Sequence, residues 1–292
     1  MIERLCIIGV GLIGGSLARV LRAREYVGEI VGYGRSVAHL DEAVRLGVID
    51  GAETSVAAAV RDADMVVIAV PIGAMRSVLS EVAAALAPNA VVTDVGSTKV
   101  SVVRDAQAEL GSRFGDFVPG HPIAGTERSG VAASFAELFE KRRVILTPDV
   151  ATRAEALERV RGMWTVAGAM VSTMPAAEHD RILAASSHLP HALAYTLVDM
   201  IVRMDEHRAI FDCVGGGFRD FTRIAASDPV MWRDIFLANR EEVVRLLRGY
   251  QSDVEALIDA VERQDGEWLV DTFARAKRAR EQLGSGNGAG GD

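Results

Sequence analysis

The stretch LCIIGVGLIGGS, residues 5–16, decides the fold of this chain. A short apolar run ends at a GxGxxG spacing, and a helical pattern opens directly after it. In this context the first glycine permits a tight turn, the second lets the backbone approach a pyrophosphate, and the third lets the helix pack closely on the strand. The helix N-terminus adds free amides and the positive end of its dipole. A glycine-rich turn that binds nothing is the alternative. The stretch predicts a dinucleotide-binding unit whose cofactor contacts Gly9, Gly11, Leu12, Ile13 and Gly14.

Outward from this loop, short runs rich in Val and Ile alternate with amphipathic helical segments as far as residue 174. The alternation is typical of βαβ units, and runs that are apolar on both faces belong in a buried parallel sheet. We predict an α/β fold with a Rossmann-like, doubly wound and mostly parallel sheet, which forms a dinucleotide-binding domain over residues 1–174. The expected strands are Leu5–Gly9, Glu29–Tyr33, Met65–Val70, Ala90–Val95, Arg143–Thr147 and Ala169–Thr173.

The second part of the chain has a different texture, because the β-branched runs stop after residue 174 and helical patterns continue to about residue 283. We predict an all-helical domain over residues 175–283, followed by a disordered Gly-rich tail over residues 284–292. One apolar series in this domain steps at heptad-like spacing. Packing within one subunit and a helix–helix dimer interface explain it equally well. The series comprises Val243, Leu247, Tyr250, Val254, Leu257 and Val261.

Composition limits the class of protein. The 292 residues are 49% apolar and 25% charged, which excludes a wholly disordered chain. The formal charge is −8 and no block of like charges is long enough to grip a phosphate backbone, so we expect no nucleic-acid partner. No apolar run reaches a membrane span and the N-terminus lacks the pattern of a signal peptide, so we expect no membrane partner. Cys6 and Cys213 are expected to be inert buried thiols of a cytoplasmic protein.

The end of the second expected strand bears on cofactor choice. An acidic residue there would bind the ribose hydroxyls of NAD and repel a 2′-phosphate. This chain instead reads GYGRS over residues 32–36, where Arg35 and Ser36 are placed to receive a phosphate. We predict dual use of NADP and NAD with a lean towards NADP; the alternative is a solvated Arg35 and binding of NAD without the carboxylate. Val70 and Pro71 end the third strand and are expected to line the same site.

Four later segments are dense in small and polar residues: DVGSTK at 94–99, GHPIAGTERSG at 120–130, SSHLPHALA at 186–194 and GGGFRDFTRIAASDPVMW at 215–232. Together with the nucleotide loop, they make the chain resemble the prephenate and arogenate dehydrogenase family over nearly its whole length. The resemblance implies NAD(P)-dependent oxidative decarboxylation of prephenate to 4-hydroxyphenylpyruvate in tyrosine biosynthesis, with arogenate as the alternative substrate. Since no further module is evident on either side, we expect the monofunctional form.

The same resemblance implies the chemistry of two residues. His121 matches the family's catalytic histidine, and a neutral imidazole can accept the proton of the substrate hydroxyl near neutral pH. Ser97 matches a serine close to that hydroxyl and is expected to orient the substrate and His121. A helix N-cap ahead of Val100 and Val103 is an equally good interpretation of Ser97 and is compatible with the first.

The remaining site residues are implied to hold a small dicarboxylate substrate. Arg223 matches an arginine that binds a carboxylate, for which a guanidinium is well suited. His191 matches a histidine that lines the substrate pocket, and we assign His188 to the pocket with it. The two histidines could be mistaken for a zinc pair, but no third ligand is apparent nearby, so we expect no metal.

Two further expectations concern the surroundings of the pocket. The resemblance implies a homodimer through the helical domain, with Trp232 near that junction. By its residue type Trp232 is more often a core or interface residue, and a pocket wall is the alternative. Inside the motifs lie four charged residues that could pair as a gate, Glu127, Arg128, Arg219 and Asp220.

Two other functions compete with this one. A β-hydroxyacid dehydrogenase would use Lys99 as its catalytic lysine, but the glycine-rich helical segment that positions such a lysine is missing. A redox sensor would bind the dinucleotide without turnover, yet it would have no need of a dicarboxylate pocket.

Overall fold

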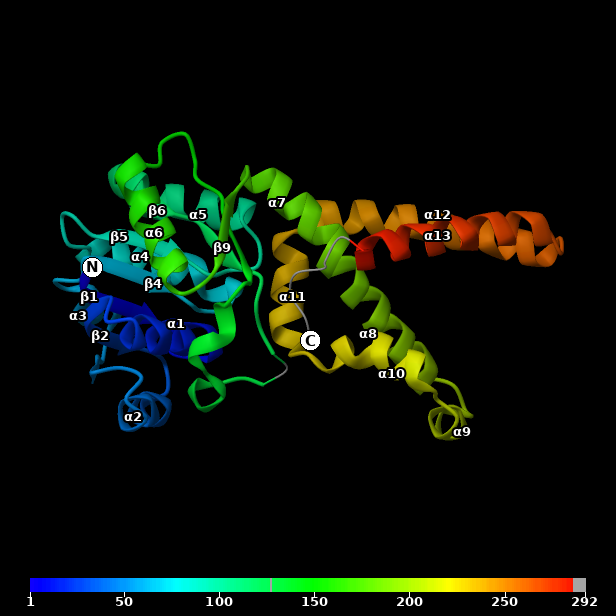
Figure 1. Cartoon of the computed structure of the whole chain (residues 1–292), viewed down its shortest axis with the longest axis horizontal. Coiled ribbons are helices and arrows are strands. Elements are labelled where there is room, and N and C mark those ends of the chain that lie inside the picture. The colour runs from blue at the N-terminus through cyan, green and yellow to red at the C-terminus, as the bar shows by residue number, and fades with distance from the viewer. Residues whose placement is uncertain (127, 286–292) are drawn as a thin grey trace. The chain divides into compact units, whose positions relative to one another are not determined.

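The computed structural model describes residues 1–126 and 128–285. By its contacts the chain divides into two compact units, residues 1–240 and a unit that begins at Glu241. Both sheets of the described residues lie in the first unit (Figure 1).

The larger sheet has six strands in the order β3-β2-β1-β4-β5-β6, and every neighbouring pair is parallel. The order reverses between β1 and β4, which is the switch point where ligands of such sheets bind. Ile8, the last residue of β1, pairs with Tyr33 on one side and Ile68 on the other, so these strand ends are level. The strands are β1 (Ile2–Ile8), β2 (Val27–Tyr33), β3 (Gly51–Ala52), β4 (Met65–Ile68), β5 (Val91–Asp94) and β6 (Phe117–Val118).

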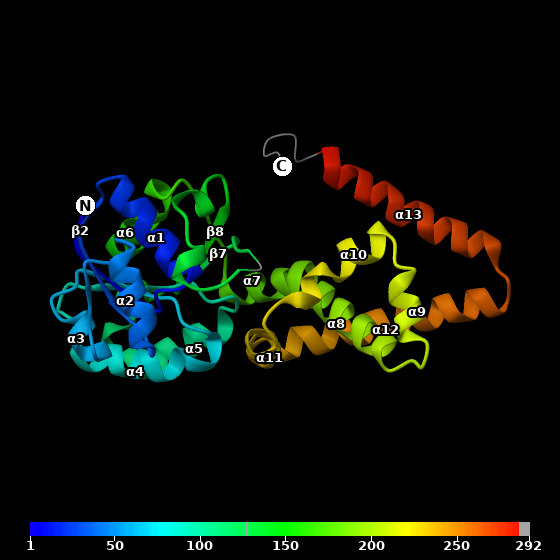
Figure 2. The same cartoon turned by 90° about the horizontal axis from the view of Figure 1, so that it is seen from below.

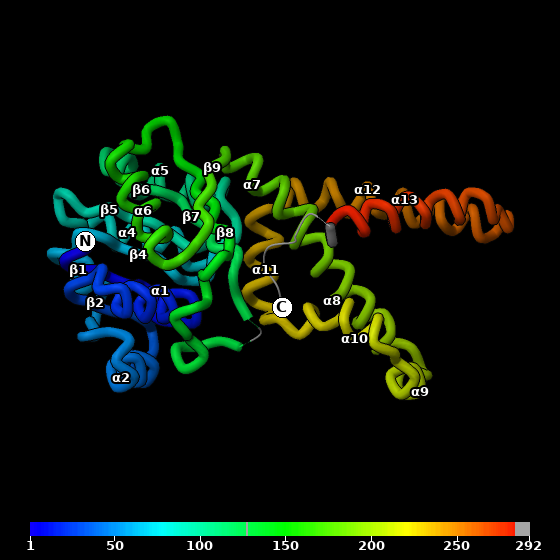
Figure 3. The backbone as a smooth tube through the Cα atoms, in the orientation of Figure 1, coloured from blue at the N-terminus to red at the C-terminus, as the bar shows by residue number. Residues whose placement is uncertain are grey.

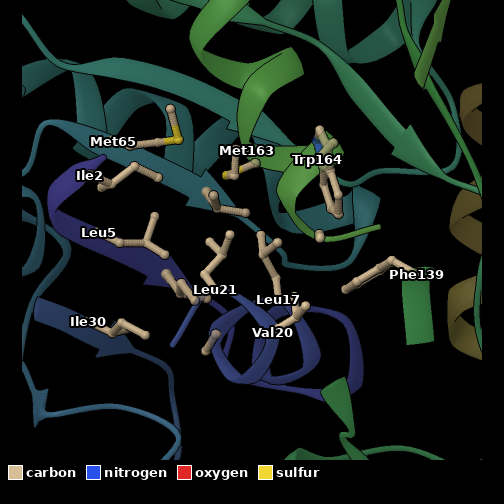
Figure 4. Packing of buried hydrophobic residues seen from close by; sticks show 14 of the residues in the cluster. Ile2, Leu5, Leu17, Val20, Leu21, Ile30, Met65, Phe139, Met163 and Trp164 are labelled. Carbon is tan, nitrogen blue, oxygen red and sulfur yellow. The ribbon is translucent and has the colours of Figure 1, made fainter. Parts of the chain in front are cut away.

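Helices cover both faces of this sheet, because β1 alternates its side chains between two cores. Leu5 and Ile7 belong to a cluster with helices α1 and α6, whereas Cys6 and Ile8 belong to a cluster with α3, α4 and α5. Figure 2 shows the two layers on opposite sides, and Figure 4 shows side chains of the first cluster, among them Leu5, Leu17 and Trp164. The helices of this part are α1 (Leu12–Ala23), α2 (Val37–Arg45), α3 (Val56–Val60), α4 (Met75–Ala85), α5 (Val100–Leu110) and α6 (Ala154–Val166).

The smaller sheet corrects one prediction. The strands expected at 143–147 and 169–173 form β8 (Arg143–Leu146) and β9 (Met170–Thr173), but they pair with β7 (Gly120–Pro122) in a separate three-stranded sheet. Within it β8 is antiparallel to β7 and parallel to β9. An apolar run indicates that a strand is buried, but it does not indicate which strand it pairs with. Pro119, which has no N–H to donate, separates β6 from β7 where the chain changes sheet.

The helices that follow contain an irregular turn beside the motif histidines. The helical path from α7 (Ala176–Leu183) to α8 (Leu189–Val202) passes through a π turn at Ala184–His188. Pro190 stands next to it and cannot donate to the carbonyl four residues earlier, and π turns are frequent at functional sites. The unit continues with α9 (His207–Asp212), α10 (Gly216–Thr222) and α11 (Pro229–Ala238).

The described part of the second unit consists of two helices, α12 (Arg240–Glu262) and α13 (Gly266–Ser285). Along the heptad-like series, Val243 is buried, whereas Tyr250 and Val261 are 41% and 58% exposed in the single chain. α13 extends two residues past the expected end of the domain. The rest of the predicted tail, residues 286–292, lies outside the described residues. None of the helices in the described residues combines the length and apolarity that a bilayer crossing would require.

The two cysteines differ in environment. Both are free thiols, and burial raises the pKa of Cys6 to about 12. Cys213 is exposed, so its predicted burial is wrong. The apolar neighbours of Cys213 in sequence belong to α9, which buries none of its residues in this chain.

Candidate active site

The glycine loop has the geometry of a phosphate cradle. Gly9 has a φ of +99°, and a Cβ added to it would lie 2.4 Å from the carbonyl oxygen of Ala69. A Cβ on Gly14 would lie 2.5 Å from the oxygen of Gly9, so β1 and α1 touch here. Gly11 faces open space and begins α1 without a side-chain cap, and the first turn of α1 carries no acid. The free amides of this helix end fit a dinucleotide pyrophosphate.

A cavity of about 540 Å³ opens beside this loop, at the carboxyl ends of β1, β2 and β4. Its volume is in the range of small-molecule sites. The structure places the predicted Leu12, Ile13 and Gly14 in the first turn of α1, outside the cavity lining. The other predicted cofactor residues all line the cavity, namely Gly9, Gly11, Arg35, Ser36, Val70 and Pro71.

Two of these residues differ in how they are engaged. The Arg35 side chain is exposed at the cavity and has no hydrogen bond or ion pair with any described residue. The Ser36 hydroxyl accepts a hydrogen bond of 3.4 Å from the amide of His39 and so caps α2. His39 also lines the cavity and was not among the predicted residues.

His121 lies on β7, directly after the chain leaves the parallel sheet (Figure 3). It is half-buried, and its Nδ1 atom lies 2.9 Å from Nε2 of His179 on α7. The two rings meet edge to face, with centroids 5.1 Å apart. The structure thus joins the predicted base to a second histidine, 58 residues away in sequence, which is fully buried.

Asp180 connects this pair to the start of α5. One carboxylate oxygen lies 2.8 Å from Nδ1 of His179 and 2.7 Å from the amide of Lys99, and the other accepts a bond of 2.9 Å from the amide of Val100. The cap of α5 is therefore supplied by α7, and the prediction of Ser97 as an N-cap is wrong. The half-buried Ser97 has no hydrogen bond to any other described residue.

Lys99 and Asp94 form an ion pair that is fully buried. Lys99 Nζ donates to Asp94 at 2.5 Å and to the carbonyl oxygen of Gly120 at 2.7 Å. Asp94 also accepts from the amides of Gly96 and Gly120 at 2.7 Å and 3.1 Å. Because Gly120 precedes His121, this pair ties the end of β5 to the strand that carries the predicted base.

The two histidines of the SSHLPH motif have different surroundings. His188 is 1% exposed, and the side-chain amide of Asn239 donates to its Nδ1 at 3.2 Å and to the carbonyl of Asp180 at 2.8 Å. His191 is half-buried and donates from Nδ1 to the carbonyl of Ser187 at 2.9 Å. Its ring stacks on Trp232, with centroids 3.7 Å apart, and Trp232 is buried within the single chain as expected for a core residue.

Arg223 begins the short turn after α10 and is exposed. Its positive charge helps to lower the pKa of His191, so the two predicted substrate residues are close enough to interact. The predicted gate is only partly described, since Glu127 lies outside the described residues. Arg128, Arg219 and Asp220 are exposed, and no ion pair joins them to each other in the described part.

Burial dominates the electrostatics of the histidines. Desolvation, with the charges of His179, Lys99 and His188, holds the pKa of His121 well below 6.5. Desolvation lowers the pKa of His188 to about 4, and it also lowers that of His191. A neutral His121 is the form that can accept a proton. No group of three or more potential His, Cys, Asp or Glu metal ligands occurs among the described residues.

These shifts predict the response to acid. A lowered folded-state pKa keeps His121 unprotonated as pH falls through 6.5, so we expect kcat/KM to stay level there and to decline only at lower pH. The unfolded chain takes up protons first, so the stability that neutral His121 and His188 contribute is complete above 6.5 and declines below it. Rate profiles and denaturant melts across this range measure both. An acid limb at or above 6.5 would contradict a desolvated base.

Sequence reasoning missed His179, Asp180 and Asn239. The adjacent His-Asp pair at 179–180 was the available signal, but on a short amphipathic helix it resembles an ordinary polar face. Only the fold shows that the pair is buried, because its partners lie about 60 to 80 residues earlier in the chain.

The fold and the site together define an oxidoreductase that binds a nicotinamide dinucleotide. A glycine cradle and its cavity lie at the switch point of the parallel sheet. The neutral His121 lies on β7, directly after the last strand of that sheet.

Comparison with known proteins gives the family. The description "Prephenate dehydrogenase, nucleotide-binding domain" matches residues 17–173, and "Prephenate dehydrogenase, dimerization domain" matches residues 175–275. This chain belongs to the prephenate dehydrogenase family.

Individual relatives are similar over nearly the whole chain. Cyclohexadienyl dehydrogenase of Zymomonas mobilis is 38% identical over 283 residues, 96% of each protein. Prephenate dehydrogenase of Bacillus subtilis is 36% identical over 97% of this chain and 76% of its own length. The crystal structure of Aquifex aeolicus prephenate dehydrogenase with hydroxyphenyl propionate and NAD+ is 39% identical, with a TM-score of 0.90 over 97% of this chain and 99% of that one. Synechocystis arogenate dehydrogenase is 25% identical over 96% of this chain and all of that one, with a TM-score of 0.81.

Proposed function

We propose that this protein is a prephenate dehydrogenase of tyrosine biosynthesis, which converts prephenate to 4-hydroxyphenylpyruvate and CO2 with reduction of a nicotinamide cofactor. The observation that carries the proposal is the neutral His121, which contacts the buried His179 and follows the sheet that forms the dinucleotide cavity. The complex of the Aquifex relative with hydroxyphenyl propionate and NAD+ supports this choice of ligands.

The reaction balances around one proton. When bound, the nicotinamide supplies the acceptor for the hydride that leaves the hydroxyl-bearing ring carbon. Positive charge then develops on that carbon, and His121 draws the proton of its hydroxyl. The electron pair of the ring–carboxylate bond enters the ring as CO2 departs, which makes the ring aromatic. Because the phenol product carries a hydroxyl proton, His121 returns the proton and none is released overall.

Three further residues complete the proposed site. Arg223 binds a substrate carboxylate, since a guanidinium can grip it in a bidentate manner. His191 contacts the substrate side chain or a carboxylate, and its position against Trp232 and near the charge of Arg223 supports this role. Ser97 orients the substrate hydroxyl, for which a hydroxyl group without a hydrogen bond to any other described residue is suited. His188, also assigned to the pocket, is 1% exposed and its Nδ1 accepts from Asn239, so we infer that it supports the pocket and does not contact the substrate.

Membership of the family does not determine which substrate and which cofactor are used. Arogenate is the second candidate substrate, because relatives named for arogenate and for cyclohexadienyl substrates are similar over the whole chain. We infer that NADP and NAD are both used, with NADP preferred. Support comes from Arg35, which is exposed at the cavity and has no partner among the described residues.

One matrix tests the function and the cofactor preference. Prephenate and arogenate are each incubated with NAD and with NADP, and absorbance of the reduced cofactor is followed. We expect turnover of prephenate with both cofactors. Arg35→Ala should raise KM for NADP by about 10- to 100-fold, the worth of one charged hydrogen bond, and leave KM for NAD within about twofold of wild type on the same ground.

The matched control is Arg45→Ala, at the other end of α2, where the side chain does not line the cavity. The absence of turnover with either substrate would refute the proposed function. A strong preference for NAD that Arg35→Ala leaves unchanged would refute only the cofactor assignment.

The structure weighs against the two competing functions. A catalytic Lys99 would have to reach the substrate, but its ammonium is fully buried and held by Asp94 and Gly120. A sensor without turnover would need neither a desolvated base nor the buried groups that hold it.

Assembly and setting complete the proposal. We place the border between cofactor and substrate domains at residues 174/175, where the two family descriptions meet. A homodimer forms through the helical domain, supported by the "dimerization domain" description and by the exposed apolar residues of α12 and α13, among them Tyr250, Val261 and Phe273. The free Cys6 and Cys213 fit a reducing, cytoplasmic setting.

A further inference from the structure

We propose that His179 and Asp180 are positioning residues that fix the tautomer of His121, so that Nε2 of His121 is the atom that takes the substrate proton. The inference rests on the proposed function and deepens it. Its basis is a chain of two short contacts, from His121 Nδ1 to His179 Nε2 at 2.9 Å and from His179 Nδ1 to Asp180 at 2.8 Å.

The direction of the chain is set at Asp180. Its two oxygens accept from the amides of Lys99 and Val100, which can only donate. A carboxylate offers about four acceptor sites and no donor. The contact of 2.8 Å with His179 therefore has its proton on Nδ1 of the histidine. Asp180 is 2% exposed, so water has little access to compete for this bond.

The next link follows from the chemistry of imidazole. In this proposal His179 is a neutral imidazole, which donates from Nδ1 and has a lone pair on Nε2, so Nε2 of His179 is the acceptor. The contact at 2.9 Å then requires that Nδ1 of His121 carries the proton. Nε2 of His121 consequently holds a lone pair, and it has no hydrogen-bond partner among residues 1–126 and 128–285.

The arrangement also prepares for the charge that His121 gains. Burial, the Lys99 ammonium before α5 and any proton on the neighbouring His179 or His188 oppose a positive charge on His121. Without a compensating contact, protonation of His121 by the substrate would therefore be unfavourable. His121 is hydrogen-bonded to His179, which is bonded to the Asp180 carboxylate. These contacts spread the new positive charge towards Asp180.

A pair of substitutions at His179 separates positioning from packing. In His179→Gln the side-chain oxygen can occupy the place of Nε2 and still accept from His121, whereas His179→Leu fills the space without an acceptor. We expect kcat to fall by about 10- to 1000-fold in His179→Leu, below the roughly 10⁴-fold loss that a wrong tautomer can cause. His179→Gln should stay within about fivefold of wild type, since it keeps the hydrogen bond. KM for substrate and cofactor should change little in either variant.

The control pair is His207→Gln and His207→Leu, at the start of α9, where the half-buried side chain bonds only to the carbonyl of Met204 within the described residues and both variants should keep wild-type kcat. Equal losses in His179→Gln and His179→Leu, with both variants folded by their unfolding midpoints, would overturn the proposal.

A second measurement is independent of turnover. Long-range 1H–15N NMR spectra of the folded protein, with the His121 signals identified by their loss in His121→Asn, report which ring nitrogen carries the proton. We expect the proton on Nδ1 in wild type and a mixture of tautomers in His179→Leu. A proton on Nε2 in wild type would refute the relay. Failure to oxidise prephenate or arogenate would refute the proposed function and leave this result standing.

Discussion

His121→Asn should lower kcat by about two to four orders of magnitude, which is the usual contribution of one acid–base group. The substitution is selective, because the Asn side-chain nitrogen can take the place of Nδ1 and keep the hydrogen bond to His179. What disappears is Nε2, the atom that faces no described partner. The developing positive charge on the substrate hydroxyl then has no base to relieve it.

Steady-state kinetics with prephenate measure the loss, and titration calorimetry of the reduced and oxidised cofactors measures binding. Cofactor affinity should remain within about twofold of wild type, because the glycine cradle is built from β1 and α1 and shares no residue with the substitution. His207→Asn, at a half-buried histidine of α9 outside the proposed site, is the matched control. A near-normal kcat in His121→Asn would remove His121 from the proposed role.

Local signals in the sequence were sufficient for the nucleotide fold. The turn at Gly9 needs a positive φ, and the contact at Gly14 leaves no room for a Cβ, so the required residue types are visible in the sequence. The apolar runs also located the long strands within a few residues. The two-residue strands β3 and β6 escaped, because a periodicity cannot be recognised over two residues.

Contacts between residues far apart in sequence could not be predicted, because they leave no local pattern. The pairing of β8 with β7 and the cap that Asp180 gives to α5 both join residues far apart in sequence. Ser97 looked like the cap by its position, yet a carboxylate from α7 supplies it. The family resemblance named His121 as a site candidate, but it carried no information about His179, whose Nε2 lies 2.9 Å from Nδ1 of His121.

The pair of Lys99 and Asp94 is the other place where one residue has a large predicted effect. Both side chains are 0% exposed, and burial lowers the pKa of Lys99 while the charges of Asp94 and Asp180 oppose that change. An isolated charge in such a place is costly, and a pair is tolerated only when every donor and acceptor is matched. Here the ammonium meets a carboxylate and the carbonyl of Gly120, and the carboxylate meets two amides as well.

Lys99→Met should therefore reduce the free energy of unfolding by about 3–5 kcal/mol, the cost of breaking a buried pair by removing one partner. Methionine fills a similar volume, so the loss comes from the unpaired Asp94 and the carbonyl of Gly120 rather than from a cavity. Chemical denaturation of wild type and variant measures it as a lower midpoint at an unchanged slope. Lys277→Met is the matched control: its side chain is 77% exposed, its partner Glu281 is one helical turn away, and its loss should stay within about 0.5 kcal/mol. Equally small losses of unfolding free energy in both variants would mean that the buried pair contributes no more than a surface pair. The ion pair would then not hold the end of β5 against the strand of His121.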